Sequence, residues 1–570
     1  MANLGIDLGT TFTCAFIAGQ DGNLEVLELC HGNRITRSVV QITKGKWSLK
    51  RPEDLASQQR KHIAHTKRLI GRTRQDGQLE GDIPKVDHAR LLDEYPFFEV
   101  GNGKILPEEI SAFILARVRQ LANTRTGTEL TGCVLAVPAY FTHQQREVTR
   151  DAAEIAGFQR HHVKLVPEPV AALVAHFYGD GQKNESAQEG EWFVIDIGGG
   201  TADVTVAYVE KMGTRRSFVV NATAGDNSLG GVNFDEALID LVLRDPKLVG
   251  PYAKLDPSQC NKVRLRASCE RAKEELSQAT FSTITVEDDE GEEVDVNISR
   301  DQAQDAWQHI IEKIRELFRD ALRLAKTSEI GNVLVAGGTG NMPCVRSIIQ
   351  EMLPAAIIHH SHLSEAVAQG AARISADTNI SITEVTPRAI GILLTEGNFG
   401  EIVSRNQALP LWKKAVFSTP QDDCESLHIA LYEGETSEAT RNIHLGDFYV
   451  MDIPPCPADT PVTVDIKMDR LGEITATASL DCLSESLHID YKPRHSQAEL
   501  RELRRLNYQR LDGTVTAQAG QSSLSCQQRD VQVGEKRPLS NEETREGTII
   551  PIKRNRRHAV IEDDSDSQEE

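Results

Sequence analysis

Two short segments of the chain combine an aspartate with a glycine-rich turn, the residue types that bind phosphate groups and hydrated metal ions. The first segment is Gly5–Thr11 (GIDLGTT), and the second is Val194–Thr201 (VIDIGGGT). Glycine lets backbone N–H groups approach an anion closely and point at it together. Carboxylates beside a polyphosphate can hold Mg²⁺, usually through water. The pair predicts a polyphosphate cleft with Mg²⁺ held through water by Asp7 and Asp196.

One apolar run precedes each glycine turn and a second apolar run follows it, which predicts a strand–turn–strand unit. The two similar units indicate a duplicated α/β domain. A third strand-then-glycine unit lies at Val333–Gly338. Apolar spacing typical of helices separates the units at 107–121, 144–156, 169–177 and 301–325. We therefore expect the glycine turns to stand at strand ends, with helices packed between them.

Composition excludes several classes of protein. The chain has 570 residues and a net charge of −21, from 63 Lys and Arg against 84 Asp and Glu. An acidic chain repels phosphate backbones, so we expect no nucleic-acid partner. No apolar run reaches the roughly 18 residues of a membrane span, and the N-terminus lacks a signal-peptide pattern. The ten cysteines form no CxxC pair, which argues against a zinc or redox site. A multidomain cytoplasmic protein without a membrane partner is expected.

Further motifs occur in order along the chain. They are TKRLIGR (Thr66–Arg72), AVPAYFTHQQRE (Ala136–Glu147), PEPVAALVAHFYG (Pro167–Gly179), AGDNSLGGVNFD (Ala224–Asp235), CERAKEELS (Cys269–Ser277), VLVAGGTGNMP (Val333–Pro343), EAVAQGAA (Glu365–Ala372) and EVTPRAIGI (Glu384–Ile392). With the two glycine turns, the series resembles the seventy-kilodalton heat-shock chaperone family from residue 4 to about residue 510.

The resemblance implies an α/β fold class, with a duplicated actin-like ATPase domain followed by an antiparallel β-sandwich that binds peptides. The implied ranges are 1–376 for the nucleotide-binding ATPase domain, 377–386 for the linker, 387–494 for the β-sandwich, 495–510 for a truncated lid helix and 511–570 for a disordered charged tail. Short alternating segments such as 462–468 and 474–480 favour antiparallel strands without any resemblance.

The resemblance also implies roles for individual residues in binding ATP or ADP with Mg²⁺ and in hydrolysis. The implied catalytic residues are Asp7, Lys67, Glu168, Asp196 and Thr201. The implied nucleotide-binding residues are Gly9, Thr10, Thr11, Gly198, Gly199, Gly200, Gly230, Gly231, Glu270, Lys273, Ser277, Gly337 and Gly338. Asp203 is a further carboxylate of the cleft. Without the resemblance, Lys67 is typical of a solvated basic run with Arg68 and Arg72.

Two other sets of residues follow from the same resemblance. Pro138, Arg146 and Glu384 would couple the two domains. Ile390, Ile392, Phe417, Leu427 and Ile429 would contact an extended apolar peptide, although their alternation alone favours an ordinary sandwich core. Partners would be unfolded or extended polypeptides, together with a J-domain co-chaperone and a nucleotide-exchange factor.

This sequence departs from the family pattern at several positions. Glu274 and Asn341 stand where arginines usually face the adenine, which predicts weaker nucleotide binding. The linker run is Ile380–Thr383 (ISIT), whose two hydroxyl residues replace apolar ones and predict weaker coupling. The helical pattern ends near residue 510, so the lid would be short and peptides would leave faster.

The last sixty residues are polar and carry 8 Lys and Arg against 12 Asp and Glu, a composition that predicts disorder. Two basic clusters, Lys536-Arg537 and Lys553–Arg557, are typical either of a nuclear-import signal or of a solubilising tail.

Two other functions stay open from the sequence. One is a nucleotide-binding regulator or scaffold with little coupled hydrolysis, suggested by the departures. The other is a small-molecule kinase on the same duplicated fold, against which the β domain argues.

Overall fold

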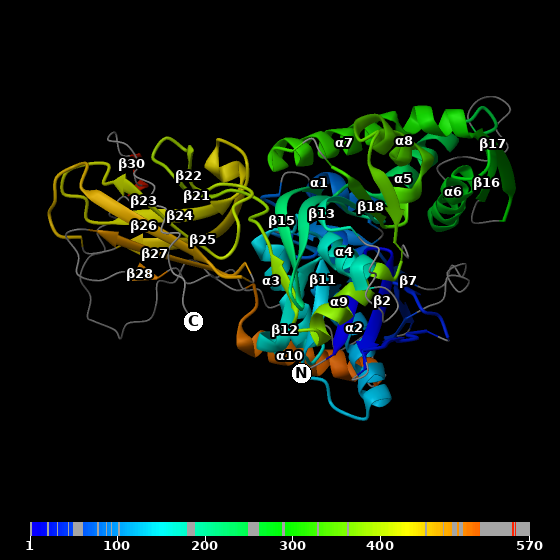
Figure 1. Cartoon of the computed structure of the whole chain (residues 1–570), viewed down its shortest axis with the longest axis horizontal. Helices are drawn as coiled ribbons and strands as arrows, with labels where there is room; N and C mark the ends of the chain where they lie inside the picture. The colour runs from blue at the N-terminus through cyan, green and yellow to red at the C-terminus, as the bar shows by residue number, and fades with distance from the viewer. Residues whose placement is uncertain are drawn as a thin grey trace.

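The computed structural model describes residues 3–19, 22–30, 32–43, 45–49, 61–76, 79–86, 88–92, 94–100, 103–178, 188–248, 261–287, 291–327, 330–361, 364–450, 453–470, 472–480, 487–488, 494–512, 550–551 and 553–554. A mixed α/β part runs up to helix α9 (Ala366–Ala376), and an antiparallel β part lies beside it (Figure 1).

The first glycine motif belongs to a six-stranded sheet in the order β12-β11-β1-β2-β3, with β4 paired to β2. β1 pairs in parallel with β11 and antiparallel with β2, and β11 pairs in parallel with β12. The strands are β1 (Leu4–Leu8), β2 (Phe12–Ala18), β3 (Leu24–Val26), β4 (Thr36–Arg37), β11 (Cys133–Val137) and β12 (Val163–Pro167).

The second glycine motif belongs to another six-stranded sheet, in the order β19-β18-β13-β14-β15-β20. β13 pairs in parallel with β18 and antiparallel with β14, so its central strands repeat the directions of the first sheet. The strands are β13 (Gly190–Ile197), β14 (Ala202–Met212), β15 (Arg215–Asp226), β18 (Asn332–Ala336), β19 (Ile357–His360) and β20 (Ile380–Thr383). The predicted repeat therefore appears as two sheets of one topology, with Asp7 and Asp196 at equivalent places.

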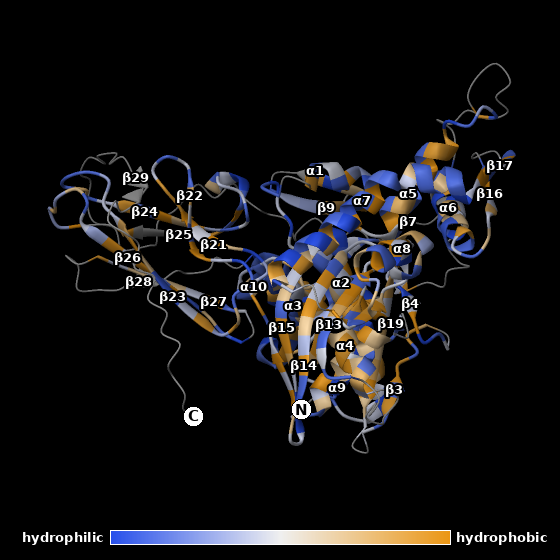
Figure 2. Ribbon diagram, turned by 45° about the horizontal axis from the view of Figure 1, so that its top comes forward, coloured by the Kyte–Doolittle hydropathy of each residue, from blue (hydrophilic) through white to orange (hydrophobic). Residues whose placement is uncertain are grey.

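Two apolar helices lie between these sheets. α9 contacts β1 and β11, while α4 (Glu168–Tyr178) contacts α9, β13 and β14, and both are largely orange in Figure 2. They cross closely: a Cβ on Gly370 would stand 1.8 Å from the carbonyl oxygen of Ala171. Because only glycine fits this crossing, the two halves of the α/β part are held at a fixed separation.

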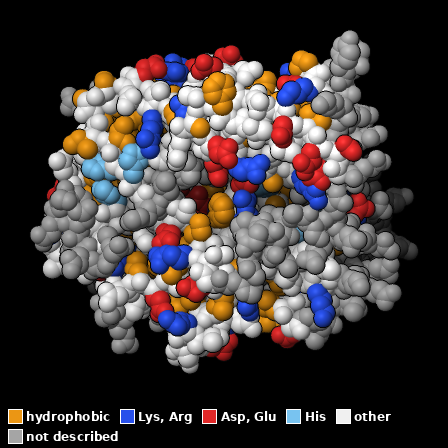
Figure 3. Space-filling model, turned by 90° about the vertical axis from the view of Figure 1, so that its right-hand side faces the viewer, with side chains coloured by type: hydrophobic (Ala, Val, Ile, Leu, Met, Phe, Trp, Pro, Cys, Tyr) orange, Lys and Arg blue, Asp and Glu red, His pale blue; other side chains and the backbone are white. Residues whose placement is uncertain are grey.

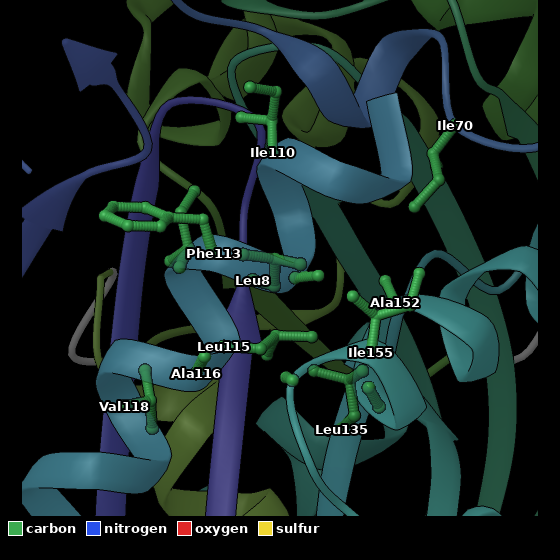
Figure 4. Packing of buried hydrophobic residues seen from close by; sticks show 14 of the residues in the cluster. Leu8, Ile70, Ile110, Phe113, Leu115, Ala116, Val118, Leu135, Ala152 and Ile155 are labelled. Atoms are coloured by element: carbon green, nitrogen blue, oxygen red, sulfur yellow. The ribbon is translucent and has the colours of Figure 1, made fainter. Parts of the chain in front are cut away.

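Other helices cover the outer faces. Figure 4 shows Phe113 and Leu115 of α2 facing Leu8 of β1, beside Leu135 of β11 and Ile155 of α3. The helices are α1 (Leu79–Asp82), α2 (Pro107–Thr126), α3 (His143–Ile155), α5 (Gly231–Val242), α6 (Lys262–Leu276), α7 (Arg300–Ala325) and α8 (Pro343–Met352). Small sheets are formed by β5 (Val40–Thr43), β6 (Lys46–Leu49) and β7 (Lys61–Ile63), by β8 (Ala89–Leu92), β9 (Tyr95–Val100) and β10 (Gly103–Ile105), and by β16 (Phe281–Glu287) and β17 (Glu293–Ser299).

The β part contains two sheets that enclose a common apolar core. One sheet holds β21 (Ile390–Leu393), β22 (Phe399–Val403), β24 (Leu427–Glu433), β25 (Ile443–Val450) and β29 (Ile550–Pro551). The other holds β23 (Leu411–Ser418), β26 (Pro461–Met468), β27 (Ile474–Leu480), β28 (Leu487–His488) and β30 (Lys553–Arg554). The pairings among β21 to β28 are antiparallel, as the alternating sequence predicts.

The predicted linker contains a strand. Ile380–Thr383 forms β20, which pairs in parallel with β15 at the edge of the second α/β sheet. Ile380 and Ile382 pack against the core cluster under that sheet. The two isoleucines that the sequence retains are therefore the ones that anchor the linker, and the hydroxyl residues stand at the alternate positions.

The helix predicted as a short lid packs on the α/β part in this structure. Helix α10 (Gln497–Leu511) contacts α2 and α3 of the α/β part, and its Leu500 and Leu503 join that core. The carboxylate of buried Glu108 accepts hydrogen bonds from Arg494 and His495, at 2.9 and 2.8 Å. These ion pairs and the apolar contacts fix the helix away from the β part.

The predicted disorder of the tail can be compared with the structure. Disorder over 511–570 is wrong at Leu511 and Asp512, which end or follow α10, and at the four residues of β29 and β30; the rest of that range lies outside the described residues.

Acidic and basic side chains lie next to one another on the face in Figure 3. None of the described helices has the length and apolar run needed to cross a membrane.

Candidate functional site

The two glycine turns lie against each other beside a cavity of about 310 Å³ between the halves of the α/β part. Thr10, Thr11, Gly198 and Gly199 line one part of it. Each turn closes with the same backbone hydrogen bond, from Gly9 N–H to Phe12 O at 2.9 Å and from Gly198 N–H to Thr201 O at 3.0 Å.

The turn at Gly199 has no room for a side chain. A Cβ on Gly199 would stand 1.9 Å from the hydroxyl oxygen of Thr11, whereas a Cβ on Gly198 would meet only the Thr201 carbonyl at 3.9 Å. Gly230 and Gly231 reach the same turn, since Gly231 N–H donates to Gly198 O at 2.9 Å. The structure thus brings together Thr11 of the first motif and glycines of two others.

Lys67 is buried in an ion pair with Glu168, near Asp7 and Asp196, and none of these four residues lines the cavity itself. Lys67 lies in the single 3₁₀ turn Thr66–Arg68, and Glu168 begins helix α4, whose positive N-terminal end favours a carboxylate. Burial lowers the pKa of Lys67, but the charges of Glu168 and Asp7 outweigh it, so the pKa lies above its usual value. Lys67 is therefore a permanent cation inside the cleft, not part of a solvated run.

Three further carboxylates share this buried space. Burial, with the charge of Glu168, raises the pKa of Asp7 to about 7 and that of Asp203 to about 8, and it also raises the pKa of Asp196. Asp203 accepts a hydrogen bond from Tyr140 N–H at 3.0 Å, while its other oxygen has no partner among the described residues. Among the described residues these acids do not form a cluster that could ligate a metal directly, so a Mg²⁺ beside them would be held through water.

The other end of the cavity is formed by α6 and the loop after β18. Glu270, Lys273, Ser277 and Gly338 line it as the resemblance implied, and Glu274 lines it as well. Lys273 pairs with Asp235 at 2.7 Å.

Some residues of this end were not predicted from the sequence. Arg37 and Arg266 line the cavity, and Arg37 pairs with Glu270 at 3.1 Å. Thr339 also lines it and donates its hydroxyl to Gly198 O at 3.0 Å. Asp235 ends one of the quoted motifs, which was a usable signal, whereas the two arginines lie in segments without a phosphate-binding pattern.

Gly9, Gly200, Gly230 and Gly337 do not line the cavity but lie in the turns that shape it. A Cβ on Gly337 would stand 2.3 Å from Ile197 O, so this glycine lets two strand ends meet. Thr201 is buried at the end of the second turn.

Arg68 and Arg72 are buried too, in a cluster that joins the two halves above the cleft. Arg72 pairs with Asp82 at 2.8 Å, and Ser228 donates a hydrogen bond to the same carboxylate. Arg68 donates to Asn233 Oδ1 at 3.1 Å and also to Ser228 O. The basic run therefore fastens the first half to the 228–233 loop of the second.

Comparison with known proteins assigns this architecture. The sequence model of the Hsp70 protein family matches residues 3–548. The chain belongs to the Hsp70 family. It is 32% identical to the chaperone protein DnaK of Psychrobacter cryohalolentis over 526 residues, which cover 88% of this chain and 79% of the relative. It is 32% identical to the heat shock protein hsp-6 of Caenorhabditis elegans, with 83% and 73% covered. It is 30% identical to the ribosome-associated molecular chaperone SSB of Candida glabrata, with 85% and 81% covered.

This Hsp70 is an ATP-dependent chaperone and an ATP hydrolase, as the motifs predicted. Hsp70 proteins bind ATP or ADP with magnesium, bind unfolded polypeptides and work with co-chaperones. The small-molecule kinase and the scaffold without hydrolysis are therefore set aside.

A chain of contacts runs from the cleft of this Hsp70 to its β part. Asp203 holds Tyr140 N–H, and Arg146 donates to Ala139 O and to Glu384, both at 3.4 Å. Thr142 caps helix α3, which fixes Arg146 in its first turn. Pro138 is buried directly after β11, at the start of this segment.

The β part contacts the same segment directly. His143 N–H donates to buried Glu433 of β24 at 2.9 Å, and the guanidinium of Arg388 lies 4.3 Å from the Tyr140 ring centre. Thr223 of β15 exchanges hydrogen bonds with Arg405 and Asn406 at 3.0 and 3.1 Å. The two parts therefore form a docked arrangement.

The residues predicted to contact peptide all lie together in the core of the β part. Ile390, Ile392, Phe417, Leu427 and Ile429 are each at most 6% exposed. Their side chains form the interior between the two sheets, so in this arrangement a peptide would meet the strand edges around them and not an open pocket.

Proposed function

We propose that the cleft hydrolyses ATP with Lys67 and Glu168 as its central pair. The observation that carries the proposal is this buried ion pair beside two phosphate-sized glycine turns. The Lys67 ammonium would contact the γ-phosphate and orient the attacking water, and Thr10, Thr11, Gly199 and Gly200 would hold the phosphates by their backbone N–H groups. Positioning and charge compensation supply most of the catalysis in phosphoryl transfer.

Asp7 and Asp196 would hold Mg²⁺ through water, which supplies charge compensation for the phosphates when bound. Their raised pKa values support this assignment, because buried carboxylates with too few cations gain from a divalent ion. Thr201 and Asp203 would orient the water shell from the second turn.

The adenosine would lie at the α6 end of the cavity, against Glu270, Lys273 and Ser277. Arg37 and Arg266 line the same cavity, where they pair with Glu270 and Glu236, and they would supply guanidinium groups that the usual positions lack. We infer that nucleotide binding is retained.

The β part would bind extended apolar polypeptide at the edges of β23 and β24, over the side chains of Phe417 and Leu427. Arg146, Glu384 and Pro138 would report the state of the cleft to this part. Allostery needs a contact that differs between two states, and the Arg146–Glu384 pair at 3.4 Å supports such a contact. Glu384 is buried, and burial raises its pKa against the effect of Arg146, so losing the pair would leave an unfavourable buried acid.

We also propose the boundaries 1–376, 377–386 and 387–494 for the two domains and their linker. A J-domain protein and a nucleotide-exchange factor are the expected partners, and the cytoplasm is the expected location.

Steady-state ATP hydrolysis with and without an unfolded polypeptide tests the proposal. Lys67→Ala should lower turnover by about 100-fold or more, because the cation is lost from the cleft. Lys211→Ala, at an exposed lysine of β14, is the matched control and should keep wild-type turnover. Equal turnover in both variants would contradict the assignment of Lys67.

A further inference from the structure

A short segment near the C-terminus adds a strand to each sheet of the β part. β29 pairs in parallel with the start of β24, with Ile550 opposite Leu427 and Pro551 opposite His428. β30 pairs antiparallel with the end of β23, with Lys553 opposite Ser418. Figure 1 shows β30 next to β23, and Figure 2 shows β29 next to β24. One stretch of tail therefore bridges both sheets.

The edges of β23 and β24 can accept an added strand because neighbouring strands leave part of them unpaired. β25 pairs along the whole of β24 on one side, whereas β21 covers only Leu431–Glu433 on the other side. β23 pairs with β26 on one side, and among the described residues its other side pairs only with β30. Unpaired backbone groups at an edge are what an added strand uses.

The edge belongs to the proposed peptide site. The backbone partners of the tail are Phe417 and Leu427, whose side chains lie in the core with Ile392 and Ile429. The tail around β29 reads Ile549-Ile550-Pro551-Ile552, an apolar and β-branched run that favours an extended chain. It has the character of the peptides that the site would select.

Charge favours the same docking. The loop 419–426 between β23 and β24 contains Asp422, Asp423 and Glu425 and no basic residue. Ser418, which is opposite Lys553, donates its hydroxyl to Asp459 at 3.5 Å. The tail continues from β30 as Lys553–Arg557, with four basic residues in five positions. Lys553 of β30 therefore pairs with Ser418, the residue directly before this acidic loop.

We propose that the segment of β29 and β30 is a tethered pseudosubstrate that occupies the peptide site of this chaperone. The proposal rests on the peptide site proposed above. A tethered segment competes at an effective concentration of about a millimolar. Weakly bound polypeptides are thus excluded, and only clients that bind more tightly displace the tail. The basic cluster then acts in docking, in addition to either role expected for it from the sequence.

The test compares two variants of the full-length chain with the wild type. Ile550→Asp with Ile552→Asp places two charges in the docked segment. Val531→Asp with Val533→Asp is the matched control, because it changes two aliphatic residues at the same spacing elsewhere in the tail. Two readouts are taken: amide hydrogen exchange at 417–418 and 427–428, and the Kd for a fluorescein-labelled peptide of sequence TIIPIKR, measured by anisotropy.

The Ile550/Ile552 variant should exchange faster at these amides and bind the probe at least tenfold more tightly, while the control matches the wild type. The protection should be the same at two protein concentrations, because the contact lies within one chain. Unchanged exchange, or protection that depends on concentration, would overturn the proposal.

Faster exchange with an unchanged Kd would place the tail outside the peptide site, which overturns the proposal and leaves peptide binding by the β part standing. If none of the three proteins binds the probe, the proposed peptide site fails, and the pseudosubstrate fails with it, while exchange still reports whether the tail docks.

Discussion

The nucleotide cleft and the peptide edge bind their ligands by opposite means. The cleft surrounds one buried ammonium with Asp7, Asp196, Asp203 and Glu168, and its turns leave no space for a Cβ at Gly199. The edge of β23 and β24 offers main-chain groups and an apolar floor. Side-chain charge and tight turns select one kind of ligand, whereas a backbone edge accepts any extended apolar chain. This difference explains how the protein's own tail can fill one site and not the other.

One added methyl group in a glycine turn tests how tightly the cleft fits its ligand. Gly199→Ala should lower ATP affinity by about 10- to 100-fold, because overpacking of about 1–3 kcal/mol falls on the phosphate turn. Gly198→Ala should change it little, since its Cβ would stand 3.9 Å from the nearest atom. Calorimetric titration with ATP measures both, and circular dichroism checks the fold. Similar losses in the two variants would contradict a steric origin.

The buried acids near the cleft should make the stability of the folded protein depend on pH. The folded-state pKa of Asp203 is about 8 against 3.8 for the free group, so the folded protein binds the extra proton. Stability without nucleotide should therefore fall as pH rises from about 4, the pKa of the free group, to about 8, the folded-state pKa. Asp203→Asn removes this titration and should flatten the dependence. Thermal unfolding at several pH values measures it, and an equal slope in the variant would contradict the assignment.

The connection between the two sites can be broken separately. Arg146→Ala and Glu384→Gln should each reduce the stimulation of ATP turnover by unfolded polypeptide several-fold. The double variant should lose little more than either one, because residues of one pair are not additive. ATP turnover of the wild type, the two single variants and the double variant, each with and without polypeptide, forms a double-mutant cycle. Fully additive losses would show that the pair at 3.4 Å does not act as a unit.

The smallest expected effect is on the tail. Replacing Lys553 and Arg554 by alanine should tighten binding of the TIIPIKR probe about two- to threefold, because the attraction between charges in water contributes little. The gain should shrink at high salt, where these charges are screened. An effect as large as that of the Ile550/Ile552 variant would mean that charge, and not backbone pairing, holds the tail.

Much of the fold was readable from local patterns. The helix over 300–325 and the strands at 461–468 and 474–480 lie within a residue of the predicted ranges, because periodicity is a local property. The strand in the linker was not predicted, since Ile380–Thr383 is polar at alternate positions and needs β15 as a partner. Helix α10 was expected as a lid, and its packing on α2 and α3 depends on distant partners, the buried Glu108 and the core that receives Leu500 and Leu503.

The sequence by itself determined the glycine turns, the aspartates at the strand ends and the family, because these depend on residue types at short spacing. The tertiary structure alone decided which charges meet. Lys67 and Glu168 are far apart in the chain and pair only once the turn Thr66–Arg68 lies beside the start of α4. The docking of Ile550–Arg554 on β23 and β24 is likewise a pairing over long separation. The average composition of the tail is polar and does not reveal one short apolar run. That run becomes a strand only because a strand edge elsewhere in the fold is open to pair with it.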